Sequence, residues 1–155
     1  GLGDVYKRQV EFNVRFGDPE TQVTIPLIES DLGEILLATA EGNISSLDPA
    51  FSTLSSATVV LASEGYPDFS KTGKEITGAD VTIDEGLSRG YVHVAGAIIQ
   101  GGKMVSSGGR VLSATGIAPS LSQAIDVAYQ IIDSISLEGS HFRNDIGYRA
   151  LPPKE

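Results

Sequence analysis

The first clear pattern in the chain is a strict alternation of apolar and polar residues from Val10 to Phe16. A period of two predicts a β-strand with one apolar and one polar face. The polar positions are Glu11, Asn13 and Arg15. These three side chains are therefore expected to form one row.

A sharp chain reversal is predicted directly after this strand. Gly17 permits a positive φ, and Asp18 can cap a helix. Pro19 suits the first helical position, and Glu20 would lie near the positive end of the helix dipole. We therefore expect the polar row to lead into a donor-rich turn and a short helix.

Two later segments have apolar residues at helical spacing. The segment 30–42 has Ser30 as a cap and Gly42 as a stop, and the segment 120–134 opens with a capping-box pattern. Both are predicted to be packing helices. The stripe predicted to be buried in the first consists of Leu32, Ile35, Leu36 and Ala40.

Between these helices the pattern changes to short apolar runs separated by glycine-rich turns, which favours antiparallel strands. The glycines at 101 and 102 predict a tight hairpin. The fold class is therefore α+β: a strand and a helix, then a small, mostly antiparallel sheet with a packed helix. The predicted strands span 57–62, 74–78, 91–99, 103–106 and a segment beginning near 108.

Composition excludes several classes of protein. The 155 residues are 41% hydrophobic and 20% charged, as is ordinary for a globular protein. The net charge of −9 disfavours non-specific binding to nucleic acid. The absence of cysteine excludes disulfides and thiolate metal sites. No apolar run approaches the ~20 residues of a membrane span, so we expect neither a membrane nor a nucleic acid as partner.

The polar row suggests cation chemistry. Residues two apart on one strand face are roughly 6.6–6.8 Å apart, so the oxygens of Glu11 and Asn13 could converge on one hard cation such as Mg²⁺. Arg15 offers a planar fork that matches a phosphate or carboxylate. The alternative is that all three are solvent-facing charges on an edge strand.

Other conspicuous residues favour structural roles. The glycine spacings fit neither a phosphate-binding P-loop nor a dinucleotide fingerprint. The glycines before Arg110 are interpreted as hairpin turns, with a supporting role of Gly108 to Arg110 beside an active site as the alternative. His93 is interpreted as a packed or solvated imidazole rather than a base. The tail, with His141 and Asp145, lacks partners at metal or triad spacing.

Several strings resemble a known family. The row Glu11-x-Asn13-x-Arg15 resembles the metal-binding strand of the ATP-grasp superfamily. The run RFGDPETQ at 15–22 resembles the signature of the phosphoribosylamine–glycine ligases, as do GGRVL at 108–112 and the tail. The resemblance covers about residues 10–151. The family typically has a second glycine where this chain has Glu64.

The resemblance implies a cytoplasmic enzyme that joins glycine to 5-phosphoribosylamine, with ATP as co-substrate and a glycyl-phosphate intermediate. Glu11 and Asn13 would hold Mg²⁺ or Mn²⁺. Arg15 would act in catalysis by stabilising the charge on the acyl phosphate or orienting glycine. Gly17 and Asp18 would shape the substrate-binding end of the site.

The predicted domain organisation follows from these strings. Residues 1–9 break the strand register and resemble a translated sequencing adaptor, so they are interpreted as a non-native leader. Residues 10–55 would end an ATP-grasp domain, 56–151 would form the carboxy-terminal α+β domain, and 152–155 a tail. The lobe that covers ATP is expected to lie upstream. An alternative function is therefore a non-catalytic module that is inactive without that lobe.

Overall fold

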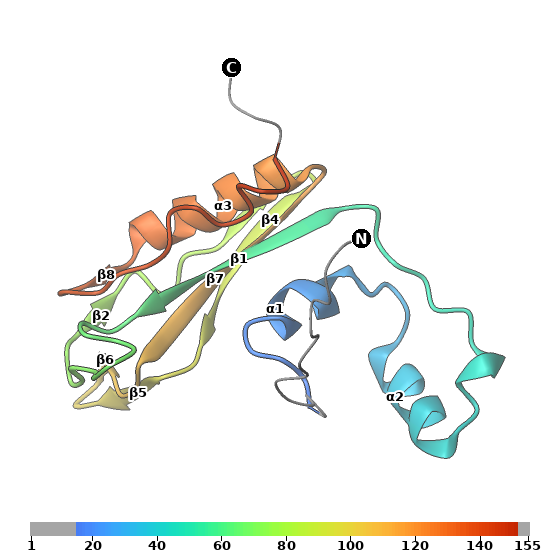
Figure 1. The fold of residues 1–155 in the computed structure, drawn as a ribbon, viewed down its shortest axis with the longest axis horizontal. Coiled ribbons are helices and arrows are strands. Elements are labelled where there is room, and N and C mark those ends of the chain that lie inside the picture. The colour runs from blue at the N-terminus through green and yellow to red at the C-terminus, as the bar shows by residue number, and fades with distance from the viewer. Residues whose placement is uncertain (1–14, 152–155) are drawn as a thin grey trace, which may run out of the picture.

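The computed structural model describes residues 15–151 (Figure 1). Helices and strands are mixed and the sheets are antiparallel, which confirms the predicted α+β class. The helices are α1 (Thr21–Thr24), η1 (Ile25–Leu27), α2 (Leu32–Glu41), η2 (Ile44–Ser46) and α3 (Leu121–Ser134). The strands are β1 (Ser55–Ala62), β2 (Ile76–Thr77), β3 (Ile83–Glu85), β4 (Ser88–Val94), β5 (Ala97–Gln100), β6 (Lys103–Ser106), β7 (Arg110–Ala118) and β8 (Ser136–Leu137).

The central sheet has the strand order β1-β7-β4-β3, and all its neighbours are antiparallel. Val59 pairs with Ala114 across β1 and β7, and both side chains are fully buried. The next residue of each strand points to the opposite face. One face is therefore apolar, whereas the other carries hydroxyls such as those of Thr58 and Thr115, which hydrogen-bond to each other at 2.9 Å.

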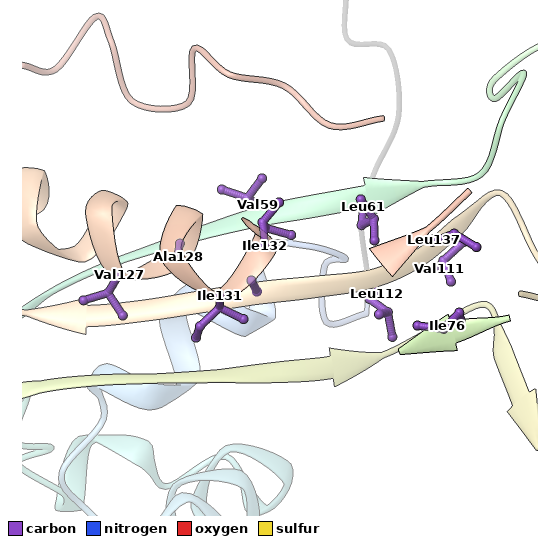
Figure 2. Packing of buried hydrophobic residues seen from close by; sticks show 11 residues of the cluster. Val59, Leu61, Ile76, Val111, Leu112, Val127, Ala128, Ile131, Ile132 and Leu137 are labelled. Atoms are coloured by element: carbon purple, nitrogen blue, oxygen red, sulfur yellow. The ribbon is translucent and has the colours of Figure 1, made fainter. Parts of the chain in front are cut away.

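Helix α3 packs along the apolar face of this sheet (Figures 1 and 2). Ser120 caps it as predicted, because its hydroxyl accepts a hydrogen bond from the Gln123 N–H at 3.3 Å. Ile131 and Ile132 of the helix are almost fully buried. Together with residues of β1, β2, β7 and β8 they form the main hydrophobic core.

Helix α1 and the turn before it lie on the other side of the sheet from α3 (Figure 1). Helix α2 extends beyond them and differs from its prediction. Its cap is Asp31 rather than Ser30, since the Asp31 carboxylate accepts from the Glu34 N–H whereas the Ser30 hydroxyl accepts from the Ala50 N–H. Only Ala38 of α2 is buried. The buried stripe predicted for this helix is therefore wrong, because one of its members, Leu36, is 44% exposed.

The predicted strand 91–99 is in fact the end of β4 and the start of β5, with a break at residues 95–96. The cause is a close backbone approach. Gly96 N–H donates to Arg110 C=O at 2.9 Å, and a Cβ on Gly96 would lie 2.6 Å from that oxygen. The chain therefore bends there, and β5 pairs with β6 through the predicted hairpin at 101–102. No helix within residues 15–151 is long and apolar enough to cross a membrane.

Candidate functional site

The signature run begins the described part of the chain. Arg15 and Phe16 lie outside any strand, while most of the predicted strand 10–16 lies outside the described residues. The Gly17 carbonyl accepts from both the N–H and the hydroxyl of Thr21. Because residues 18–20 form a turn, α1 begins at Thr21 rather than at Pro19 as predicted. The run is thus a compact loop followed by one helical turn, and we call residues 16–22 the signature loop.

Asp18 does not cap α1; its carboxylate serves other partners. One oxygen, Oδ2, forms an ion pair with Arg110 Nη2 at 2.9 Å. The other, Oδ1, accepts from the Gln22 side-chain amide at 2.9 Å. Arg110 Nη1 also donates to the Asp18 carbonyl at 2.9 Å. Both carboxylate oxygens and the carbonyl of Asp18 are therefore held by groups of the protein itself.

A cavity of about 560 Å³ lies between the signature loop and the central sheet. Residues 16–18 of the loop, one side of α1 and η1, and Tyr91 and His93 of β4 line it. This volume is within the range of small-molecule sites, and the mixture of aromatic, aliphatic and a few polar groups is typical of them. The two residues that the sequence predicted to bind substrate, Gly17 and Asp18, both line this cavity.

Tyr91 and His93 form the sheet side of the cavity. Their rings meet edge to face, with centroids 5.0 Å apart. Burial lowers the pKa of the His93 imidazole and raises the pKa of the Tyr91 hydroxyl. Both groups are therefore neutral at pH 7. Neither residue belongs to a recognisable motif. Their alternation with the buried Gly90, which faces α3, is the signal that places them on the opposite face.

Two polar atoms beside the cavity have no hydrogen-bond partner within residues 15–151. They are Nε2 of His93 and the side-chain oxygen of Gln22, and both are buried. Buried polar atoms are normally hydrogen-bonded, to protein, water or a ligand. The interface between the signature loop and the sheet is thus a place where a water or a ligand group has polar atoms to bind.

Arg15, predicted to be catalytic, lies at the start of the described chain beside this loop. Its Nη1 donates to the Phe16 carbonyl at 2.9 Å. Glu11 and Asn13, predicted to bind the metal ion, lie outside the described residues. Within residues 15–151 there is no group of three or more His, Cys, Asp or Glu side chains placed to hold a metal ion.

Arg110 belongs to this site, although the sequence suggested this only as the less favoured alternative. The GGRVL string was interpreted mainly as a turn, with a supporting role beside the active site as the alternative. The contact of Arg110 with Asp18 joins positions 92 residues apart. Its only sequence signal was a lone cation after two glycines, which could not reveal the partner.

A second charged cluster lies away from this cavity. Glu64 pairs with the ammonium groups of Lys71 and Lys74. Hydrogen bonds from these two lysines lower the pKa of Glu64 to about 2. Lys74 also contacts Glu138 at 3.3 Å. The carboxylate is therefore a structural link between the loop after β1 and the carboxy-terminal segment.

Comparisons with known proteins agree with the sequence resemblance. The family model described as phosphoribosylglycinamide synthetase, C domain, matches residues 56–149. The phosphoribosylamine–glycine ligase of Chlorobaculum tepidum is 46% identical over 142 residues, which cover 92% of this chain and 33% of that protein. The trifunctional purine biosynthetic protein adenosine-3 of Gallus gallus is 46% identical over 143 residues, covering 92% of this chain and 14% of that protein.

The fold has a counterpart among solved structures. The crystal structure of the phosphoribosylamine–glycine ligase of Thermotoga maritima matches with a TM-score of 0.65 and 33% sequence identity, over 88% of this chain and 32% of that one. This chain thus spans about a third of the length of the single-function ligases that it matches. The resemblance inferred from RFGDPETQ and the tail is confirmed.

Proposed function

We propose that this chain, which belongs to the phosphoribosylglycinamide synthetase C-domain family, supplies the substrate-binding loop and carboxy-terminal domain of an ATP-dependent ligase. The reaction is the joining of glycine to 5-phosphoribosylamine in the cytoplasm, an early step of purine synthesis. The observation that supports this best is the signature loop, which is held over a cavity of about 560 Å³ by a residue of the family domain itself.

The chain's own residues have distinct roles in this proposal. Asp18 shapes the loop, since its carboxylate oxygens are occupied by Arg110 and Gln22. Gly17 lets the backbone approach substrate, and a Cβ there would lie 2.4 Å from the Glu20 carboxylate. Arg15, next to the loop, would stabilise negative charge on the acyl phosphate or orient the glycine carboxylate.

Glu11 and Asn13 would hold Mg²⁺ or Mn²⁺. Their carboxylate and amide oxygens are the donors that such hard cations take. When bound, the ion would neutralise the nucleotide phosphates and align the transferring group. This part of the proposal rests on the donor types and on the family likeness, because both residues lie outside the described chain.

The second candidate function is a non-catalytic module. Helix α2 favours it, because Leu36 and Leu37 are 44% and 59% exposed and so lack the covering that a complete core would give them. We therefore expect the 155-residue chain alone to turn over no substrate, as a ligase of this type needs a lobe that covers ATP.

One experiment separates the two functions. Residues 10–151 would replace the matching third of the Chlorobaculum tepidum ligase, and phosphate release would be measured with ATP, glycine and phosphoribosylamine. We expect turnover that requires all three substrates in the chimera and none in the isolated chain. A correctly folded chimera without ligase activity would contradict the enzyme proposal, and turnover by the isolated chain would contradict the need for another lobe.

The metal assignment has its own test in the same chimera. Glu11→Ala should raise the Mg²⁺ concentration needed for half-maximal rate, because one charged oxygen ligand is lost. Glu29→Ala is the matched control, since Glu29 is an exposed carboxylate outside the signature loop. An unchanged metal requirement in Glu11→Ala would remove Glu11 from the site.

A further inference from the structure

Arg110 connects the family domain to the signature loop through two separate contacts. Its Nη2 pairs with the Asp18 carboxylate and its Nη1 donates to the Asp18 carbonyl, both at 2.9 Å. Two contacts from a planar guanidinium to one residue define that residue's orientation as well as its position. The side chain and the backbone of Asp18 are therefore fixed together.

The anchor for this contact is rigid. Arg110 is the first residue of β7, and its carbonyl accepts from the Gly96 N–H at 2.9 Å. The preceding Gly109 packs so closely against Tyr66 that a Cβ on it would lie 2.4 Å from the ring. The guanidinium thus extends from a well-packed strand end toward a loop that has little regular structure of its own.

The pair contributes little to overall stability. The side chains of Arg110 and Asp18 are 41% and 46% exposed, and ion pairs with this much solvent contact are weak. Its effect is therefore local, on residues 16–22. The same loop lines the cavity, and the half-buried Gln22, whose side-chain amide donates to the other oxygen of Asp18, also lines it.

We propose that Arg110 is a positioning residue for substrate binding: it sets the conformation of the signature loop through Asp18 and so determines the shape of the cavity wall. Arg110 itself need not touch substrate. The link to substrate rests on the proposed ligase function, whereas the link to loop conformation does not.

The conformational part is tested on the 155-residue chain by amide hydrogen exchange. In Arg110→Met we expect the amides of Thr21 and Thr24, which close the first turn of α1, to exchange roughly tenfold faster, as follows from losing a charge-assisted hydrogen bond. The exchange rate of these amides in Arg110→Lys should lie between those of Arg110→Met and the parent, because a lysine keeps the charge but cannot make both contacts. The melting temperature should change by less than about 4 °C.

Arg143→Met is the matched control. Arg143 forms an equally short two-bond pair with Asp145 in the tail, at 2.8 Å for each bond. Its removal should leave exchange in α1 unchanged. Equal exchange in Arg110→Met and the parent, or equal acceleration in the control, would overturn the proposal.

The catalytic part is tested in the chimera with the Chlorobaculum tepidum ligase. Arg110→Met should raise KM for glycine or phosphoribosylamine roughly tenfold and leave KM for ATP unchanged, with partial rescue by Arg110→Lys. A simple loss of folded enzyme would lower kcat alone, which would overturn the link to substrate. If the unsubstituted chimera is inactive, the proposed function fails, and the exchange measurement alone decides whether Arg110 positions the loop.

Discussion

Replacing Gly116 by alanine should destabilise the domain strongly. Gly116 lies near the end of β7, on the face covered by α3. A Cβ there would lie 2.1 Å from the Ala124 carbonyl and 2.8 Å from the Ala128 nitrogen. Both are backbone atoms of a helix, so they cannot rotate away. The helix would have to move outward by more than an ångström along a core that includes Ile131 and Ile132.

The expected cost follows from this geometry. Overpacking a well-packed core costs about 1–3 kcal/mol, and a clash with backbone belongs at the upper end of that range. Gly90 provides a matched control, because it pairs with Gly116 across β4 and β7. A Cβ on Gly90 would meet Ile131 Cδ1 at 2.5 Å and Val127 Cγ1 at 2.6 Å, which are ends of side chains. Gly90→Ala should therefore cost about 1 kcal/mol or less.

The assay is urea unfolding of the two variants and the parent, followed by circular dichroism. We expect Gly116→Ala to lower the free energy of unfolding by about 3 kcal/mol with an unchanged m-value. This corresponds to a melting temperature about 6–12 °C lower. If Gly116→Ala is no less stable than Gly90→Ala, the close approach of α3 to β7 is not the constraint described here.

Three further predictions concern side chains outside the core. Glu64→Gln should reduce stability at pH 7, because a carboxylate with a lowered pKa stabilises the fold only while it is ionised. The difference from the parent should vanish as the pH falls from the ordinary carboxyl pKa of about 4.5 toward the folded-state pKa of about 2. A pH-independent difference in urea midpoint would refute this. Below about pH 6.5 the parent should lose stability, since burial lowers the pKa of His93 and the unfolded chain binds that proton more readily. His93→Phe should reduce this loss, which unfolding experiments at pH 7.5 and pH 5.5 measure. Tyr129→Phe removes a hydroxyl that donates to Arg143 C=O at 2.8 Å and accepts from Ile146 N–H at 3.2 Å. It should lower the free energy of unfolding by about 1–2 kcal/mol and make a protease cut the tail faster. A tail that is cut no faster than in the parent at the same protease concentration would contradict this.

The elements with strong local signals were predicted correctly. The capping box before α3, the apolar run of β1 and the glycines of the β5–β6 hairpin each determine their structure within a few residues. Gly42 also ends α2 in a left-handed conformation, with φ 73°, as its place after the periodic segment predicted. These features depend on neighbours along the chain, which a single sequence contains.

Several differences between prediction and structure share one cause, which is contact between distant parts of the chain. The break between β4 and β5 depends on a backbone approach of Gly96 to Arg110, which periodicity does not reveal. Asp31 rather than Ser30 caps α2, because the Ser30 hydroxyl accepts a hydrogen bond from the distant Ala50 N–H. The role of Arg110 in the candidate site is of the same kind. The predicted domain boundary near residue 55 remains a prediction.

The arrangement of the central sheet explains why the signature loop and the family domain belong to one physical unit. The two faces of β7 and its neighbours have different coverings: α3 packs on the apolar face, and α1 lies on the other side with the loop that precedes it. Arg110, at one end of β7, contacts Asp18, while Gly116, near the other end, contacts the backbone of α3. A shift of α3 would therefore move the strand whose first residue holds the loop. Since Tyr91 and His93 of the adjacent β4 line the cavity, the sheet that packs against α3 on one face forms a wall of the candidate site on the other.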